Sequence, residues 1–330
     1  LQSFDHSIEH WNHSSIIRAE AHFFVFIIAH IFLWRNPYFE KSRMVSSKKL
    51  FRQCDEIISK SAIFPIDFCA ISLYNGVIEY EGENCVGELY AIVSGKGGTG
   101  KTSVCAGVAT ALAESGKSVL CIDCDVGLRN LDISLGMSDC GALSFLDVCS
   151  GSYTLEDACR HPKYDTLRFL TAPMNVPVEE IDLERFGDLL RQARKVYDFV
   201  FLDAPAGVDA GFRLTSTWTD RFLLVTGSGP AAVRDAARVS DLLELEGKKN
   251  VRLIVNRVDE EMLSTVRLTI DDVMDATGTP LAGLVPEDPN ITLAAAFGVP
   301  VLLYAKRCPA ARAFRRIAGR LEGVSSKIKL

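Results

Sequence analysis

The feature that most constrains this chain is the loop from Ser94 to Ser103, which reads Ser-Gly-Lys-Gly-Gly-Thr-Gly-Lys-Thr-Ser. Gly95, Gly100, Lys101 and Thr102 satisfy the G-x-x-x-x-G-K-S/T pattern of a phosphate-binding loop. Glycine lets successive backbone N–H groups wrap around phosphate oxygens because no Cβ stands in the way. A chain that holds such a loop must place a strand before it and a helix after it.

The flanking residues meet both requirements. Residues 88–93 form a mostly apolar run typical of a buried strand, and residues 102–114 carry apolar side chains at helical spacing. The helix N-terminus then faces bound phosphate with its partial positive charge. We expect Lys101 to meet the β- and γ-phosphates and the Thr102 hydroxyl to ligate Mg²⁺. The predicted contacts to ATP in this loop are Gly95, Lys96, Gly97, Gly98, Thr99, Gly100, Lys101, Thr102 and Ser103.

From Gly87 onward, strand patterns alternate with helix patterns, which predicts an α/β fold. We expect a doubly wound, mostly parallel sheet with helices on both faces and nucleotide at the carboxyl ends of the strands. Further strands are predicted at 118–125, 167–173, 199–203, 222–226, 251–256 and 281–285, and further helices at 183–193, 231–246 and 270–276.

Composition narrows the class of protein. The net charge of −6 argues against a protein that coats nucleic acid. The ten cysteines show no framework spacing and read as reduced thiols, so we expect a cytoplasmic protein. The single C-x-x-C, Cys121 to Cys124, lies at a strand, where its thiols would point to opposite faces of the sheet. We interpret both as small buried residues rather than as a zinc or iron–sulfur site.

The two ends of the chain differ from its middle. Residues 1–87 lack the alternation of strands and helices, and we predict a disordered or spurious extension there. Its apolar stretch at 23–34 is too short for a confident membrane span. His6, His10 and His13 share a helical spacing, but nothing else in the chain completes a metal site with them. The predicted ATPase domain is 88–323, followed by a short tail at 324–330.

Carboxylates end two of the predicted strands. Asp123 and Asp125 close the second strand, and Asp203 closes an apolar run at 199–202. Beside a phosphate loop, such carboxylates hold a metal ion with its waters and orient an attacking water. For either Asp123 or Asp125 alone, we would favour a helix N-cap or a solvated loop carboxylate. Together they favour a functional site.

Three motifs in order resemble the ParA/MinD family of deviant Walker A ATPases. Lys96 sits at the position of the family's second, signature lysine. The stretch 125–132, Asp-Val-Gly-Leu-Arg-Asn-Leu-Asp, resembles the first switch of members that position the division septum, and 203–207, Asp-Ala-Pro-Ala-Gly, is similar to their second switch. The resemblance covers roughly residues 87–323.

The resemblance implies a role for each matching residue. Lys96 and Lys101 would act in catalysis, with Lys96 reaching the nucleotide bound by a partner subunit. Asp125 would position the hydrolytic water. The resemblance also implies that Mg²⁺ and its waters are held by Thr102, Asp123 and Asp203. It further implies that nucleotide is sensed by Asn130 and that adenine is contacted by Asn256 and Arg257.

The implied function is that of an ATP hydrolase which dimerises on binding ATP and Mg²⁺ and positions the division septum. Its implied partners are a second copy, a septum inhibitor and a division protein that stimulates hydrolysis. Two alternatives remain: a ParA-like ATPase that positions other cargo, and a flagellar-number regulator. Partition ATPases more typically show Asp-x-Asp-Pro-Gln-Gly at the first switch, and the flagellar regulator usually lacks the Asp-x-Pro-Ala-Gly second switch.

The C-terminus departs from the family pattern. Septum-positioning members end in a basic amphipathic helix that binds the membrane surface, whereas only Val-Ser-Ser-Lys-Ile-Lys-Leu follows Gly323 here. We therefore expect weak peripheral contact with the inner membrane. The apolar stripe Ala310, Ala313, Phe314, Ile317, Ala318 and Leu321 predicts a last core helix with a solvated basic face.

Overall fold

A computed structural model describes residues 87–330, except 175, 267, 268, 326, 327, 329 and 330. The described residues belong to one compact unit, Tyr80–Leu330. The expectations for residues 1–86, including the three histidines and the apolar stretch at 23–34, lie outside the described residues.

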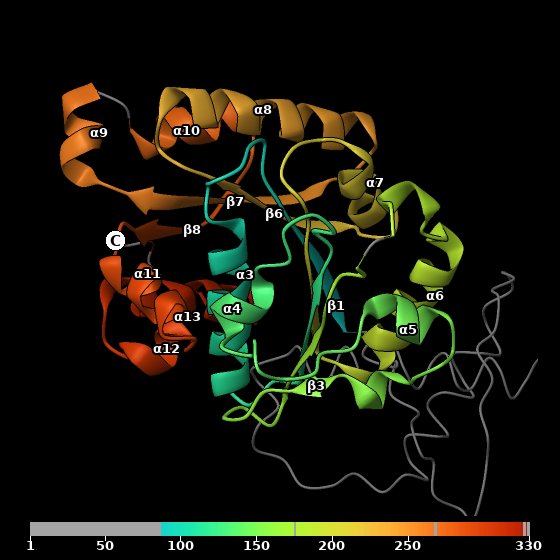
Figure 1. Ribbon diagram of the computed structural model, residues 1–330. Coiled ribbons are helices and arrows are strands. Elements are labelled where there is room, and N and C mark those ends of the chain that lie inside the picture. The colour runs from blue at the N-terminus through green and yellow to red at the C-terminus, as the bar shows by residue number, and fades with distance from the viewer. Residues whose placement is uncertain (1–86, 175, 267–268, 326–327, 329–330) are drawn as a thin grey trace, which may run out of the picture. The chain divides into compact units, whose positions relative to one another are not determined.

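Eight strands form one sheet in the order β3-β4-β2-β5-β1-β6-β7-β8 (Figure 1). Every neighbouring pair is parallel except β3 and β4. The predicted mostly parallel sheet is thus confirmed. The strands are β1 (Glu88–Val93), β2 (Val119–Asp123), β3 (Cys159–Arg160), β4 (Leu167–Leu170), β5 (Phe199–Asp203), β6 (Arg221–Thr226), β7 (Asn250–Val258) and β8 (Leu281–Pro286).

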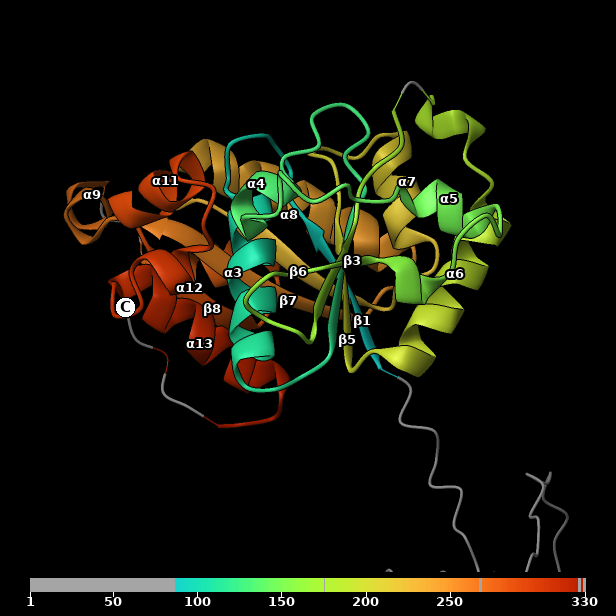
Figure 2. The ribbon, with the colours of Figure 1, turned by 60° about the horizontal axis from the view of Figure 1, so that its bottom comes forward.

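Helices cover both faces of the sheet, as Figures 1 and 2 show from two sides. One face packs against α5 (Phe145–Cys149), α6 (Leu183–Val196), α7 (Ala210–Ser216), α8 (Pro230–Leu245) and α10 (Ile270–Thr277). The other packs against α3 (Lys101–Glu114), α4 (Leu131–Leu135), α11 (Pro289–Ala296), α12 (Val301–Tyr304) and α13 (Pro309–Leu321). The remaining helix is α9 (Glu260–Val266), and short 3₁₀ turns lie at Leu155–Asp157 and Val178–Glu180.

Strand residues alternate between two apolar cores because the sheet is covered on both sides. Phe186 and Phe212 fill the core on one face, and Phe201 and Phe314 fill the core on the other. Cys121 and Cys124 divide between these two cores and are both fully buried, as predicted. Among the described residues, no group of three or more His, Cys, Asp or Glu side chains is placed to hold a metal ion by itself.

Two predicted strands end earlier than expected. The second ends at Asp123 rather than at 125, because the Asp123 carboxylate accepts a hydrogen bond from the Asp125 N–H and turns the chain. The strand predicted at 167–173 is β4, and it ends at Leu170. The next residue, Thr171, pairs instead with Ser144 just before α5. The short α5 was not predicted, although its Ser144-x-x-Asp147 capping box is a readable start signal.

The last core helix is confirmed as α13, with its predicted apolar stripe buried. The expectation of a solvated basic face holds for the exposed Arg312 but was wrong for two other arginines. Arg315 pairs with Glu114 on α3, and Arg320 donates to the Ala282 carbonyl on β8. These contacts anchor α13 to both neighbours. Within the described part of the chain, no helix combines the length and the apolar character needed to cross a bilayer.

The contact between α3 and α13 predicts opposite effects for two helical glycines. A Cβ on Gly107 would come within 2.5 Å of the Phe314 ring, whereas one on Gly319 meets only Val324 at 3.8 Å. We expect Gly107→Ala to lower the free energy of unfolding by about 1–2 kcal/mol, because overpacking outweighs its gain in helix propensity. Gly319→Ala should raise it by up to about 1 kcal/mol. Urea denaturation midpoints of both variants provide the measurement, and a stabilised Gly107→Ala would contradict the packing described here.

Candidate nucleotide-binding site

The phosphate loop connects the carboxyl end of β1 to α3. Gly98 and Gly100 have φ of 78° and 85°, in the left-handed region that favours glycine. No side chain of the described residues caps the start of α3, so its first N–H groups can bind an anion. The Ser94 hydroxyl donates to the Lys96 carbonyl at 3.0 Å and fixes the entry of the loop.

The two lysines of the loop differ in exposure. Lys101 is buried, with 8% of its surface exposed, at the start of α3. Lys96 is exposed, as are Gly97 and Gly98 beside it. One cation therefore lies within the loop and the other projects from it.

The Asn256 side chain supports the phosphate loop through a hydrogen bond. Its side-chain N–H₂ donates to the Thr99 carbonyl at 2.8 Å, and a Cβ on Gly100 would lie 2.2 Å from the same nitrogen. The side chain is buried, and its Oδ1 has no hydrogen-bond partner among the described residues. The structure thus gives Asn256 a supporting contact that sequence reasoning missed, since the partners lie 157 residues apart.

Two buried carboxylates meet beside the loop. In the strand register, Asp203 at the end of β5 lies opposite both Ile92 of β1 and Asp123 of β2. Burial, together with the neighbouring Asp203 charge, raises the pKa of Asp123 to about 7. Burial likewise raises the pKa of Asp203 to about 6, although Lys101 and the Thr102 hydroxyl act in the opposite direction.

This donor set fits Mg²⁺. Asp203 is 2% exposed, and its Oδ1 has no hydrogen-bond partner within the described residues. Lys101 and the Thr102 hydroxyl both act to lower the pKa of this carboxylate, and the Asp203 charge in turn raises the pKa of Asp123. A buried carboxylate with a raised pKa and an unpartnered oxygen is stabilised by a divalent cation, which prefers oxygen ligands.

The first switch is held by the Asp123 carboxylate. One oxygen accepts from the Asp125 N–H at 2.9 Å and the other from the Leu131 N–H at 3.2 Å, so both ends of the switch bind one side chain. Asp125 is half-buried and accepts from the N–H groups of Gly127 and Leu128. Asn130 is exposed at the start of α4.

Arg129 in the same switch makes a contact that sequence reasoning missed. Its backbone has φ of 49°, and its guanidinium donates to the Thr171 hydroxyl through Nε at 3.1 Å and Nη2 at 2.9 Å. Local sequence carries no signal for this pairing, because Thr171 lies 42 residues away. The first switch is therefore tied to the segment that follows β4.

The second switch begins at Asp203 and returns toward the phosphate loop. The Ala204 N–H donates to the Ile92 carbonyl, and the Gly207 N–H donates to the Ser94 carbonyl at 3.1 Å. Gly207 has φ of 92° and allows this turn. The second switch and the entry of the phosphate loop are thus adjacent.

The two residues predicted to contact adenine, Asn256 and Arg257, both lie near the end of β7. Arg257 is exposed and pairs with Glu287, with Nε and Oε2 2.7 Å apart. Asp288 caps α11 through the Asn290 N–H and also accepts from the Ala310 N–H. The ends of β7 and β8 are therefore linked, and Asp288 has a structural role there.

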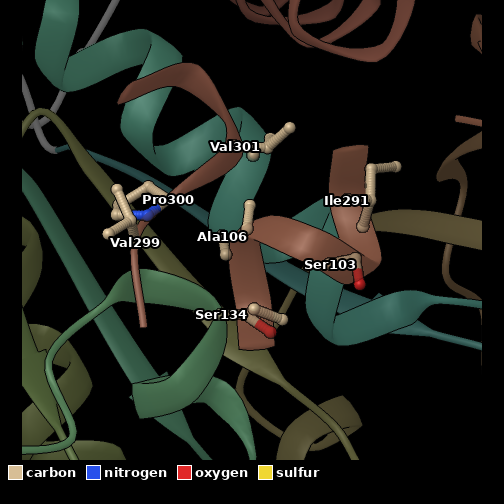
Figure 3. Close-up of a pocket in the computed structure, with 10 residues that line it drawn as sticks. Ser103, Ala106, Ser134, Ile291, Val299, Pro300 and Val301 are labelled. Carbon is tan, nitrogen blue, oxygen red and sulfur yellow. The ribbon is translucent and has the colours of Figure 1, made fainter. Parts of the chain in front are cut away.

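A small cavity lies beside α3, and its lining includes Ser103 at the end of the phosphate loop. It is lined by α3, α4, α11 and the turn into α12, and Figure 3 shows Ser103, Ser134 and Ile291 around it. Its volume of about 20 Å³ holds about one water molecule. This cavity is too small to hold a nucleotide.

The structure brings most of the predicted site together. Asp123, Asp203, Lys101 and Thr102 meet at one end of the sheet, with both switches beside them. A phosphate loop between a parallel strand and a helix, with carboxylates ending β2 and β5, defines a P-loop nucleotide-binding protein. The individual ligand assignments stay predictions.

Comparison with known proteins places the chain within this class. A family model described as the CobQ/CobB/MinD/ParA nucleotide binding domain matches residues 90–301. The chain belongs to this family and is a MinD-like ATPase. A septum site-determining protein MinD from Synechocystis sp. is 36% identical over 237 residues, which cover 71% of this chain and 89% of that protein.

Solved structures agree with this placement. The MinC:MinD cell division protein complex of Aquifex aeolicus contains a chain with a TM-score of 0.68 and 35% identity, covering 74% of this chain and 98% of that one. A MinD of Pyrococcus horikoshii complexed with Mg-ADP has a TM-score of 0.63 and 29% identity, covering 71% and 96%. These relatives support an ATPase function in division-site placement.

The buried carboxylates predict a pH dependence of the metal-free protein. Because the pKa of Asp123 is raised in the folded state, the folded chain binds this proton more tightly than the unfolded chain. Through Asp123, stability should therefore fall as pH rises from about 4 to about 7, by at most about 4 kcal/mol. Asp203 adds a smaller fall of the same sign, because its pKa is raised to about 6. Thermal unfolding at a series of pH values without Mg²⁺ measures the slope. Asp123→Asn should remove the Asp123 part of the slope, and an unchanged slope would refute the assignment.

Proposed function

We propose that this chain is an ATP-driven dimerisation switch that acts in placing the division septum. The observation that carries the proposal is the contrast between the two loop lysines: Lys101 is buried within its own loop, and Lys96 projects into solvent. A projecting cation beside the phosphates suits a nucleotide bound by a second copy. ATP would hold two copies together, and hydrolysis would release them.

Each residue has a role in this scheme. The loop from Gly95 to Ser103 binds the phosphates, while Thr102, Asp123 and Asp203 hold Mg²⁺ and its waters. When bound, Mg²⁺ neutralises negative charge on the phosphates. Asp125 orients the attacking water, and Asn130 on the exposed part of the first switch responds to the γ-phosphate. Asn256 and Arg257 lie on the adenine side, where Asn256 also supports Thr99.

The partners follow from the same proposal. The Aquifex aeolicus relative forms a complex with MinC, which supports a septum inhibitor as a partner of this chain. A second division protein would accelerate hydrolysis and so shorten the life of the dimer. We also propose weak peripheral contact with the inner membrane through Ile328 and the lysines of the tail, strengthened when two tails act together.

The dependence of the ATPase rate on protein concentration tests the switch. If only the dimer hydrolyses ATP, the rate per molecule should rise with concentration and then level off. Sedimentation velocity with a non-hydrolysable ATP analogue should show a dimer that is absent with ADP. A rate strictly proportional to concentration, with monomer under all conditions, would rule the switch out.

Substituting the two loop lysines should separate binding from catalysis. Lys101→Ala should lose nucleotide binding, since its own loop loses the buried cation. Lys96→Ala should bind ATP normally but lose hydrolysis by on the order of 10³-fold, the effect of a basic group supplied in trans. Fluorescent-nucleotide titration and phosphate release provide the two readings. Equal loss of binding in both variants would contradict the division of roles.

Replacing Asp125 should stop turnover without preventing assembly. Asp125→Ala should bind ATP and dimerise, but hydrolyse at least about 10²-fold more slowly, because the water loses its orienting group. The exposed Asp139, on the loop after α4, provides a control of the same charge. Asp139→Ala should hydrolyse ATP at the wild-type rate. Normal turnover by Asp125→Ala would remove Asp125 from the catalytic mechanism.

A further inference from the structure

An exposed apolar and basic surface lies at α11 and α12, outside the nucleotide site. Leu293, Phe297 and Tyr304 are 44%, 67% and 40% exposed. The rings of Phe297 and Tyr304 stack with centroids 5.6 Å apart. Lys306, Arg307 and Arg312 follow closely in the chain and are also exposed. We call these six residues the α11–α12 surface, and Figures 1 and 2 show its helices on one side of the sheet.

The charge of this part of the chain is opposite to that of the rest. Residues 289–330 hold eight basic residues and one acidic residue, a net charge of +7. The whole chain carries −6, so residues 1–288 carry −13. Basic residues thus concentrate in the segment that contains the exposed aromatic pair. Such asymmetry indicates an anionic partner for this segment.

Some of these cations already have structural roles. Arg315 is bound to the Glu114 carboxylate and the Lys306 carbonyl, and Arg320 donates to the Ala282 carbonyl. The three cations of the α11–α12 surface are exposed instead. Aromatic residues and arginine are enriched at protein interfaces, and Trp, Tyr and Arg most often dominate the binding energy.

We propose that the α11–α12 surface binds an acidic protein segment that carries apolar side chains. Its apolar groups would cover Leu293, Phe297 and Tyr304, while its carboxylates would pair with the exposed cations that follow Tyr304 in the chain. An anionic bilayer fits less well. Three exposed cations contribute only about 1 kcal/mol each at a membrane surface, and three apolar side chains add too little for stable attachment.

The surface lies next to the first switch. The helix α4 includes the last two residues of the switch and ends at Leu135. A Cβ on the next residue, Gly136, would lie 2.6 Å from the Gly298 carbonyl and 2.8 Å from Pro300. Gly298 and Pro300 belong to the short turn that joins Phe297 to α12. A segment bound at the α11–α12 surface would therefore contact the part of the fold that packs against α4, and the cavity of Figure 3 lies at the same junction.

Fluorescence anisotropy with the full chain tests the proposal. The probe is a fluorescein-labelled helical peptide with Glu along one face and Leu and Phe at i and i+4 on the other. We expect micromolar binding that is weakened at least about tenfold by Phe297→Ser or by the double charge reversal Lys306→Glu/Arg307→Glu, the size expected when one interface anchor is lost. The same peptide with Lys in place of Glu should not bind.

Matched variants control for general effects. Leu245 on α8 is 86% exposed, and Lys195 on α6 is an exposed cation on the other face of the sheet. Leu245→Ser and Lys195→Glu should bind the peptide like wild type. The proposal is overturned if the Lys-substituted peptide binds equally well or if Phe297→Ser binds the Glu peptide normally. Two further outcomes also overturn it, both in the case where the wild-type protein does not bind the Glu peptide. In the first, Phe297→Ser abolishes sedimentation with phosphatidylglycerol vesicles. In the second, Phe297→Ser abolishes ATP-dependent self-association. Peptide binding needs no ATPase activity, so these outcomes are independent of the proposed dimer switch.

Discussion

The parallel pairing of β5 with both β1 and β2 is the constraint on which the rest of the site depends. Because β5 lies between them, Asp203 is brought level with Ile92 on one side and with Asp123 on the other. The phosphate loop leaves β1 one residue after Val93. Lys101, Thr102 and the two carboxylates therefore meet at one edge of the sheet. A change of register by one residue would turn Asp203 into the opposite core.

This arrangement stores an unfavourable electrostatic interaction. Two carboxylates are buried side by side, and burial is the largest cause of the raised pKa of each. The protein compensates in part with backbone N–H donors to Asp123 and with Lys101 and Thr102 beside Asp203. An unpartnered oxygen on Asp203 remains. The site is therefore least stable when empty and ionised, and a bound cation relieves the repulsion.

Sequence alone predicted the elements that follow local rules. The strand 88–93 and the strand 199–203 have the predicted bounds, and α3 begins one residue earlier than expected. Buried parallel strands and a phosphate loop have strong local patterns, which explains this success. The short helices α4 and α5 were missed because a single turn or two carries no detectable periodicity. Contacts such as Arg129 with Thr171 join distant segments and have no local signature at all.

The double hydrogen bond of Asp123 determines how the first switch can move. Since one carboxylate holds the N–H groups at both ends of the segment, those ends remain at a constant separation while the side chain stays in place. Displacement is confined to the residues between them, which include the outward-facing Leu128 at 71% exposure. The segment consequently behaves as a closed loop with a fixed base. A spectroscopic label at the exposed position 128 would report its motion.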